Sequence, residues 1–449
     1  MPLKISVRIL ITEEALRLGN GHWPRYVQDL AEGFRAAGDH VDVLAHKDAA
    51  QKVFDAVPGA VPWFHRDCRA DARSQGLIGG IRHNVSFCRD LAKWLDEHEP
   101  YDWVLSLSSR PKHLLAFALL ARKKRLARTR YLVLFVLGFG KVAVHRPVGG
   151  RAEFRPGAAN AFAKLCFALL RGPVRRGQVV LAAETKEMQG ELQRFSGLPA
   201  SLYPHPVELL PEVRDRSPEV GGPRSEDRGP RTESSGQRTG SGGRSSETGG
   251  QTSEIRDQRS GGGDQKVVTV IAPGFARHEK GSDLLQDAIK IVREKAKGGA
   301  RFVLQWQEDF PMPDGTMMRP DEGLKQSGDV DYLGSILTGS QYFEFLAGGD
   351  IVVLPYRSAS YSRRVSRVSV EAALMGKPIV YTRNTWSAEV AEMAGCGVEV
   401  SEETPASIAL AILSALEQVD GLRARAASGA SAVRGYYCVA QFRRQLAAE

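Results

Sequence analysis

Apolar and polar positions follow two rhythms along this chain. Short runs rich in Val, Ile and Leu, such as SVRILI at 6–11, alternate with longer stretches in which apolar residues return every three or four positions. The first pattern predicts a buried parallel strand and the second an amphipathic helix. One such helix is expected over 23–38, where Gly38 favours a stop. Its apolar positions are Tyr26, Val27, Leu30, Ala31 and Phe34.

The same alternation runs through both halves of the chain. It predicts an α/β protein made of two doubly wound, Rossmann-like domains, each with a parallel sheet that helices cover on both faces. Such domains hold ligands at the carboxyl ends of their strands. Further strands are expected at 103–107, 131–137, 179–183, 267–273, 301–306, 350–355 and 378–382, with helices at 282–296 and around Glu371, the latter ending at Leu374 or Met375 before Gly376.

One long stretch breaks the alternation. Residues 211–265 contain twelve glycines, no Phe, Tyr or Trp, and only three aliphatic side chains. A segment of this composition cannot bury enough apolar surface to offset the entropy that it would lose on ordering. We therefore expect a disordered linker over 209–265, between an N-terminal domain over 1–208 and a C-terminal domain over 266–449.

The composition is that of a globular protein, with 42% hydrophobic and 25% charged residues. No apolar run approaches the roughly 20 residues needed to cross a bilayer, and the N-terminus lacks the cleavage pattern of a signal peptide. A cytoplasmic location is therefore expected. The five cysteines lie far apart without a CxxC spacing, which favours reduced thiols over disulfides or a zinc site. No metal site and no cofactor are predicted.

Basic residues are concentrated in one part of the chain. The net charge is +9, but the stretch from Arg110 to Arg176 carries sixteen Lys or Arg and a single acid, Glu153. A field of this sign attracts anions. The candidates are an anionic or lipid-linked acceptor, or the anionic inner face of a membrane with the protein at its periphery. A solvated basic surface is the alternative, and nucleic acid is not expected, because no binding motif accompanies the bases.

The segment APGFARHEKGSDLLQDA at 272–288 predicts a strand, a turn and a helix start. Arg277 and Lys280 lie in the turn, and Ser282 or Asp283 is expected to cap the helix that follows. Cations beside the free amides of a helix start suit a diphosphate. The alternative is a surface turn with two solvated bases.

The segment LPYRSASYSRRVSRVSVEAALMGKPIV at 354–380 predicts a strand end, a loop and a second helix start. Arg363 and Arg364 precede this start, where free amides would hold phosphate, and Glu371 lies one to two turns inside the helix. A carboxylate at that depth can accept hydrogen bonds from both hydroxyls of a ribose. The alternative is an ion pair within the helix between Glu371 and Arg367.

Together these segments resemble the GT-B superfamily of glycosyltransferases, specifically its retaining, family 1 and 4-like members that use nucleotide sugars. PGFARHEKGSDLLQDAI is similar to a strand, turn and KG-headed helix of that family, and VDYLGSI to a loop near the nucleobase. YFEFLAGGDIVVLPY and SRVSVEAALMGKPIV resemble its most recognisable block. The resemblance implies two domains facing each other across a cleft and a hexosyltransferase reaction that needs no metal.

By this resemblance, Lys280 takes the role of a lysine that holds the donor diphosphate, and Arg277 replaces an arginine whose usual place is held by Phe275. Glu371 matches the second of two glutamates in the family's last block, the one that meets ribose, whereas Arg363 occupies the place of the first. This departure puts the donor sugar and retention in question. The catalytic residues implied are Lys280 and Arg277, and the donor-binding residues implied are Glu371, Arg363, Arg364, Ser366 and Gly21.

The first half matches the family less closely. LRLGNGHWPRYVQDLAEGFRAAGDHVDVL is similar to its Gly-rich loop, helix and second strand, in which the loop containing Gly21 lies beneath the donor phosphate and His22 faces the cleft. Many relatives have a histidine near the position of Gly138, which this chain lacks. The acceptor-side residues implied are His22 and His113, although a structural or solvated role for His113 stays open.

The expected function is transfer of a sugar from a nucleoside diphosphate to an acceptor bound mainly by the first domain, in the assembly of cell-surface polysaccharide or glycolipid. Lys280, Arg277 and the helix start before Glu371 would stabilise the charge that grows on the departing diphosphate. Two alternatives stay open. One is a catalytically inactive GT-B scaffold or binding protein, favoured by the missing glutamate and histidine, and the other is a sugar-nucleotide epimerase of the same fold.

Overall fold

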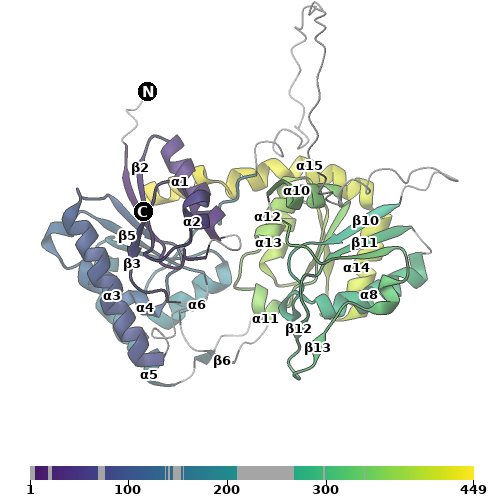
Figure 1. Ribbon diagram of the computed structural model, residues 1–449, viewed down its shortest axis with the longest axis horizontal. Helices are drawn as coiled ribbons and strands as arrows, with labels where there is room; N and C mark the ends of the chain where they lie inside the picture. Colours follow the sequence, from purple (N-terminus) through teal and green to yellow (C-terminus); the bar gives the residue numbers. More distant parts are fainter. Residues whose placement is uncertain are drawn as a thin grey trace, which may run out of the picture.

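The computed structural model describes residues 6–18, 23–68, 76–136, 138–139, 142–144, 153–154, 156–209, 267–296, 299–337 and 339–449. Gly21, His22 and, apart from Leu209, the linker expected over 209–265 lie outside these residues. The described part forms two α/β units side by side, each built around its own parallel sheet (Figure 1).

The first unit is built on a seven-stranded sheet with the order β3-β2-β1-β4-β5-β8-β9, in which every pairing is parallel. Ile9 is in register with Val41 on one side and Trp103 on the other. The strands are β1 (Arg8–Thr12), β2 (His40–His46), β3 (Ala60–Phe64), β4 (Trp103–Ser106), β5 (Arg130–Phe135), β8 (Val179–Ala183) and β9 (Ser201–Leu202), with a separate antiparallel pair, β6 (Val142–Val144) and β7 (Glu153–Phe154).

Helices cover both faces of this sheet, because its strands are apolar on both sides. In β1, Leu10 enters one core while Ile9 and Ile11 enter the other, which explains the continuous apolar run in the sequence. All five apolar positions predicted for the first helix are buried. The helices are α1 (Trp23–Ala36), α2 (Gln51–Ala56), α3 (Gly76–Glu97), α4 (Pro111–Leu120), the 3₁₀ turn η2 (Lys124–Leu126), α5 (Ala158–Arg175) and α6 (Lys186–Ser196).

The second unit repeats this architecture with a six-stranded parallel sheet of order β14-β11-β10-β15-β16-β17. Its strands are β10 (Val268–Ala272), β11 (Ala300–Gln305), β14 (Val330–Leu333), β15 (Ile351–Leu354), β16 (Ile379–Thr382) and β17 (Gly397–Val400), with an antiparallel pair, β12 (Phe310–Pro311) and β13 (Met317–Met318). Its helices are η3 (His278–Lys280), α8 (Ser282–Ala296), α9 (Glu322–Lys325), α10 (Gly339–Gly348), α11 (Ser358–Tyr361), α12 (Arg367–Leu374), α13 (Trp386–Met393), α14 (Pro405–Glu417) and α15 (Val419–Tyr436).

The described backbone crosses between the units twice. At the first crossing the amide of Val207 donates a hydrogen bond to the carbonyl of Tyr437, at 2.9 Å. At the second, the chain leaves α15 and forms α16 (Val439–Ala448), which runs back to the first unit (Figure 1). Phe442 of α16 packs edge-on against Phe34 of α1, with 6.1 Å between the ring centroids. The last helix thus joins the core of the first unit, whereas the sequence assigned all of 266–449 to the second domain.

None of the described helices has the length and apolar character that crossing a membrane requires.

Candidate functional site

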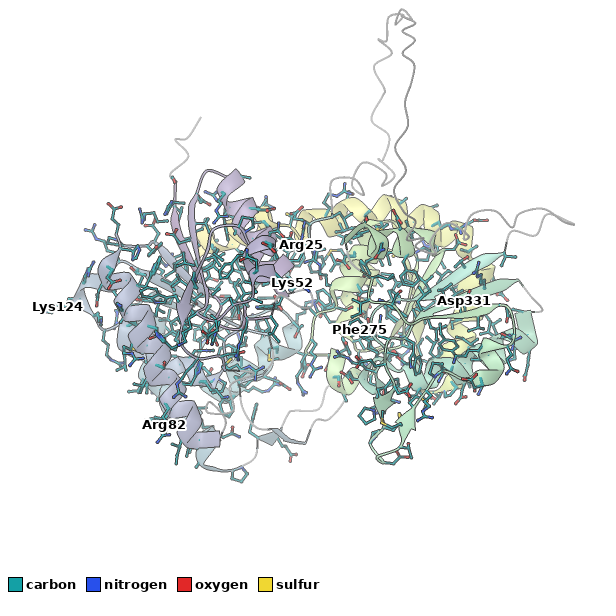
Figure 2. All side chains as sticks on the ribbon, in the orientation of Figure 1. Arg25, Lys52, Arg82, Lys124, Phe275 and Asp331 are labelled. Atoms are coloured by element: carbon teal, nitrogen blue, oxygen red, sulfur yellow. The ribbon has the colours of Figure 1, made fainter. Side chains whose placement is uncertain are left out.

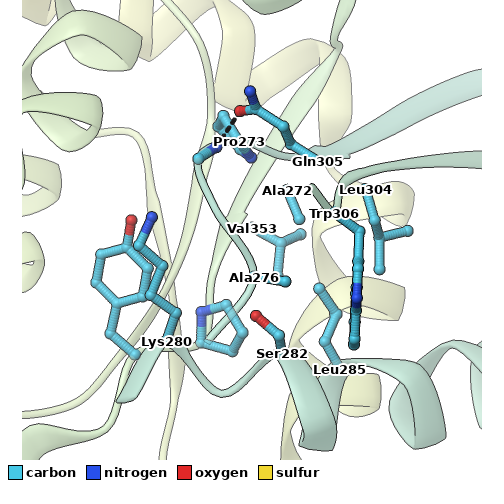
Figure 3. A pocket seen from close by; sticks show the side chains of 13 residues that line it. Ala272, Pro273, Ala276, Lys280, Ser282, Leu285, Leu304, Gln305, Trp306 and Val353 are labelled. Atoms are coloured by element: carbon cyan, nitrogen blue, oxygen red, sulfur yellow. Dashed lines mark hydrogen bonds between the residues drawn. The ribbon is translucent and has the colours of Figure 1, made fainter. Parts of the chain in front are cut away.

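The turn between β10 and α8 places Lys280 beside a small hollow. The hollow is shallow and open, and its empty space amounts to about 310 Å³ when the solvent at its mouth is counted. The half-buried side chain of Lys280 borders it and lies alongside the ring of Tyr356, with 5.9 Å between Nζ and the ring centroid (Figure 3). Ser282, at the first position of α8, and Gln305, at the end of β11, complete its polar walls.

Two glycines give this turn its shape. Gly281 has a φ of 67°, and a Cβ at this position would overlap the carbonyl oxygen of Pro355 after β15. Gly274 has a φ of 86°, and a Cβ there would overlap the Nζ atom of Lys280. Its amide donates a hydrogen bond to Oε1 of Gln305 at 2.5 Å (Figure 3). The glycine after Lys280 is therefore required by the close approach of two loops, as well as by its backbone conformation.

Lys280 is held without an anionic partner in the part of the chain that the structure describes. Burial and the charge of Arg277 together lower the pKa of Lys280 to about 8, and Glu279 acts in the opposite direction. Its Nζ atom makes no hydrogen bond or ion pair with any described residue, and its neighbours include the Gly274 backbone and the Tyr356 ring. A bound anion would offset the loss of hydration, so this ammonium suits a phosphate or diphosphate.

The predicted cap of α8 takes a different form. Oγ of Ser282 accepts a hydrogen bond from the amide of Arg277, at 3.1 Å, and so fixes the preceding turn. The carboxylate of Asp283 is paired with Arg357, at 2.6 Å. Both side chains predicted as caps are thus used to hold the loops together around Lys280.

Arg277 lies on a second, adjoining hollow of about 650 Å³, again counting the solvent at its open mouth. Its guanidinium is exposed, 3.7 Å from Glu279 and 6.0 Å from the ring centroid of Phe275. Ala276 belongs to the walls of both hollows. Arg277 and Lys280 therefore line two adjoining hollows, and they do not line the same one.

The second predicted helix start forms as α12. Oγ of Ser366 accepts a hydrogen bond from the amide of Ser369 at 3.4 Å and lies 3.5 Å from the hydroxyl of Tyr356. The helix ends at Leu374, and Gly376 follows with a φ of 66°, as the sequence predicted. Ser366 is therefore the cap of this helix, and its hydroxyl is already in use within the protein.

The carboxylate of Glu371 is buried and paired. Oε1 accepts a hydrogen bond from Nε of Arg367 at 2.7 Å, and Oε2 accepts one from the hydroxyl of Tyr342 at 2.8 Å. Arg367 also contacts Asp29 of α1 at 3.1 Å and the carbonyl of Glu208 at 3.5 Å. Burial acts to lower the pKa of Arg367, but Glu371 and Asp29 outweigh it and raise that pKa. The ion pair that the sequence left open as an alternative is thus present, and it extends to the first unit.

Arg363 and Arg364 differ in their surroundings. Nε of Arg363 donates a hydrogen bond to Oε1 of Glu191 on α6, at 2.7 Å, and only 10% of its side chain is exposed. Burial raises the pKa of Glu191, and the charge of Arg363 opposes this shift. Arg364 is exposed. Arg363 therefore joins the two units, and it lines neither hollow.

Tyr356 separates the two predicted halves of the donor site. Its ring lies beside Lys280, and its hydroxyl lies near Ser366 at the start of α12. Glu371 is not among the residues that line the Lys280 hollow. Glu371 lines neither of the two hollows described here, and a ligand that meets both Lys280 and Glu371 must first free Glu371 from Arg367.

His113, predicted on the acceptor side, is fully buried and does not reach the surface. Its Nε2 lies 2.8 Å from Oε1 of Glu14 and 3.2 Å from Nε2 of His83, while its Nδ1 accepts a hydrogen bond from the amide of Arg110. Glu14, Cys68 and His113 form a cluster of groups that are typical metal ligands. Because Nδ1 accepts an N–H, the proton of the neutral ring is on Nε2 and is directed at Glu14. This placement fits a structural role for His113, which the sequence left open.

A second buried network was not predicted from the sequence. Glu184 follows β8, and its Oε1 accepts a hydrogen bond from the hydroxyl of Tyr26 at 3.0 Å and lies 2.8 Å from Nδ1 of His205. The rings of Tyr26 and His205 stack at 4.4 Å. The network joins α1 to the first crossing, and the one signal in the sequence was an acid, Glu184, directly after the apolar run at 179–183.

Two family models match the chain, one for each unit. The model described as "Glycosyl transferase 4-like domain" matches residues 24–203, and the model described as "Glycosyl transferases group 1" matches residues 265–418. No curated protein matches the chain.

Several solved structures are similar over almost the whole chain. HepE of Anabaena in complex with UDP has a TM-score of 0.57 at 14% identity, over 98% of each chain. Sucrose-phosphate synthase of Thermosynechococcus elongatus has a TM-score of 0.57 at 13% identity, over 98% of this chain and 97% of its own. A putative UDP-N-acetylglucosamine 2-epimerase of Listeria monocytogenes has a TM-score of 0.51 at 12% identity, over 99% and 95%. These similarities identify the fold as GT-B, and with both family models matched the chain belongs to the group 1 and 4-like GT-B glycosyltransferases.

Proposed function

We propose that this protein transfers a hexosyl group from a nucleoside diphosphate sugar to an acceptor bound by the first unit. The observation that carries the proposal is the Lys280 turn. It presents an ammonium without an anionic partner among the described residues, next to the first amides of α8 and above a hollow. Solved complexes of the similar protein HepE with UDP and with UDP-glucose support a donor of this class.

In the proposed reaction, the bond between the sugar C1 atom and the diphosphate breaks, and an acceptor oxygen forms the new bond to C1. The electron pair leaves with the diphosphate, which also takes up the proton of the acceptor hydroxyl. Lys280 and the amides at the start of α8 stabilise the negative charge that grows on the diphosphate. These groups belong to the chain itself, so we propose that the reaction is metal-independent.

We propose supporting roles in this reaction for the other predicted residues. Arg277 supports the diphosphate from the adjoining hollow, with Arg364 nearby in the loop before α12. Glu371 meets the ribose after it exchanges Arg367 for the two hydroxyls. For Gly21 and His22, which lie outside the described residues, we keep the roles that the family resemblance implies, at the donor phosphate and on the acceptor side.

We place the reaction on the cytoplasmic side, in the assembly of cell-surface polysaccharide or glycolipid, with an anionic or lipid-linked acceptor. The strongly basic stretch from Arg110 to Arg176 supports this choice. Coulomb attraction raises the local concentration of an anionic acceptor beside such a surface.

The second candidate is a GT-B protein that binds a partner without catalysis. The ion pair between Arg363 and Glu191 favours it, since a structural contact has replaced a glutamate that the family keeps near the donor sugar. An epimerase of the same fold is the third candidate.

A panel of nucleotide sugars separates the three. The transferase predicts a rise in melting temperature with one donor and release of nucleoside diphosphate that depends on acceptor extract. A binding protein releases none, and an epimerase converts the donor without acceptor. Absence of any thermal shift across the panel would contradict the proposed donor site.

A further inference from the structure

Helix α3 exposes apolar side chains where a surface helix normally exposes polar ones. Leu77, Ile78, Ile81 and Val85 are exposed by 38%, 67%, 36% and 57%. Their spacing places them on one side of the helix. These four residues are called the α3 stripe below. A contiguous exposed apolar patch of this kind marks an interaction site.

Basic residues accompany the stripe, and acids are absent from it. Arg82 and Arg89 lie on the same exposed side of α3, and Arg82 projects from the lower end of the first unit (Figure 2). The side chain of Arg89 is 72% exposed, with its Nε 3.5 Å from the buried Asp90. Residues 76–89 contain no Asp or Glu. The surface is therefore both apolar and positively charged.

The helices that pack beside α3 also expose apolar and basic side chains. Leu119 of α4 and Leu165 of α5 are exposed by 47% and 57%. Neither α4 nor α5 contains an acid. The exposed basic residues of α5 are Lys164, Arg171 and Arg175.

The stripe lies at the edge of the sheet where this fold binds its ligands. Nδ2 of Asn84 on α3 donates a hydrogen bond to the carbonyl of Pro111, at the first position of α4. Helices of a parallel α/β unit begin at the carboxyl ends of the strands, where ligands bind. Leu18, 63% exposed in the segment after β1, lies at the same edge.

We propose that the α3 stripe and its flanking arginines bind the anionic surface of a phospholipid bilayer. Helix α3 lies in the plane of the interface, with Leu77, Ile78, Ile81 and Val85 inserted at the acyl boundary and Arg82 against headgroup phosphates. A second copy of the chain fits less well, because two identical basic surfaces repel each other. The inference rests on the proposed function in one respect, since it brings a lipid-linked acceptor to the edge where the first unit would bind it.

The test is flotation of the full chain with vesicles of phosphatidylcholine alone or mixed with phosphatidylglycerol. The chain should bind the mixed vesicles, and added salt should weaken this binding. Ile78→Ser with Val85→Ser should lower the partition coefficient by roughly tenfold or more, because two inserted apolar side chains are lost. Arg82→Glu with Arg89→Glu should lower it by roughly fivefold for each arginine, or more. The matched control is Leu410→Ser on α14 of the second unit, 61% exposed, which should leave binding and melting temperature unchanged.

Equal partition of the unchanged chain and the Ile78→Ser, Val85→Ser variant would overturn the proposal. So would equal binding to both kinds of vesicle at every salt concentration. A dimer seen by light scattering that this double variant dissociates would assign the stripe to self-association instead. The assay contains no sugar donor, so a failure here leaves the transfer reaction standing. Lys280→Ala, which tests that reaction, should bind vesicles like the unchanged chain.

Discussion

The two helix starts that the sequence predicted to hold the donor are used in opposite ways. At the start of α8, Lys280 borders a hollow and has no anionic partner among the described residues. At the start of α12, Arg363 and Arg367 are bound to carboxylates of the first unit, and Glu371 is bound to Arg367. The same strand, turn and helix arrangement thus prepares an anion site in one place and fastens two units together in the other.

The fastening site should show the largest effect on stability. Arg367→Met leaves the carboxylates of Asp29 and Glu371 buried without their shared cation, which costs roughly 3–5 kcal/mol. Burial already raises the pKa of Asp29, although Arg367 and Arg25 oppose this shift. Chemical denaturation measures the loss. Arg301→Met, which breaks an exposed pair with Asp331, is the control and should cost about 1 kcal/mol or less; equal losses in both variants would remove the contrast.

The anion site should show the largest effect on turnover. Lys280→Ala removes the charge opposite the departing diphosphate, so kcat should fall by roughly 10²–10³, while the melting temperature stays almost unchanged. Lys377→Ala is the control, because Nζ of Lys377 donates hydrogen bonds to the carbonyls of Ala347 and Gly349. It should lower the melting temperature and leave turnover intact. Lys280 would be structural if its variant lost stability and kept its turnover.

A charge exchange separates fastening from donor binding at Arg363. Arg363→Glu places two carboxylates together at the junction of the units and should cost about 2 kcal/mol or more. The combination with Glu191→Arg restores the pair and should restore the melting temperature and the radius of gyration in solution scattering. If UDP affinity then stays low in the restored variant, Arg363 contacts the donor after all.

The pH dependence of UDP binding sharpens the same contrast. The ammonium of Lys280 binds the diphosphate, and its pKa is about 8 in the free protein. The complex raises that pKa, so UDP affinity is constant from about pH 7, where the terminal phosphate of UDP is fully ionised, to about pH 8, and falls by up to about tenfold per pH unit above it. Titration calorimetry at several pH values measures this slope. Lys280→Arg keeps its charge and should bind UDP with a flat profile; an unchanged slope in this variant would assign the pH effect to another group.

The smallest effect is expected at the edge of the fastening network. Tyr342→Phe removes one hydrogen bond to Glu371 and should cost about 0.5–1.5 kcal/mol of stability. If Glu371 must leave Arg367 to meet the ribose, this variant should also bind UDP somewhat more tightly. A loss of UDP affinity would instead indicate that Tyr342 positions Glu371 for the ligand.

Local patterns predicted the elements of the fold because their causes are local. The run of Val and Ile in β10, the apolar spacing of α1 and the stop at Gly376 each follow from residues a few positions apart. The helix expected over 282–296 has those bounds in the structure. The alternation of strands and helices predicted two such units. That they face each other across a cleft was implied only by the family resemblance.

The partners at the site could not be predicted in the same way. Asp29 is separated from Arg367 by 338 positions, and Tyr342 from Glu371 by 29, so no spacing rule connects them. His113 was an acceptor-side candidate in the sequence, with a structural or solvated role left open, and its buried contacts are with Glu14 and His83 from two other parts of the chain. The sequence showed which side chains could bind a ligand, but their actual neighbours depend on how the chain folds.

The hydrogen bond between Val207 and Tyr437 has a mechanical consequence. The described backbone passes from one unit to the other at two places only, near Val207 and near Tyr437. The hydrogen bond holds these two segments next to each other. Because the two connecting segments are bonded to each other, they form a single hinge, and the units can move relative to each other mainly by rotation about it. The length of the segment 210–266 then has little influence on how the units open and close, and insertions or deletions there should be tolerated.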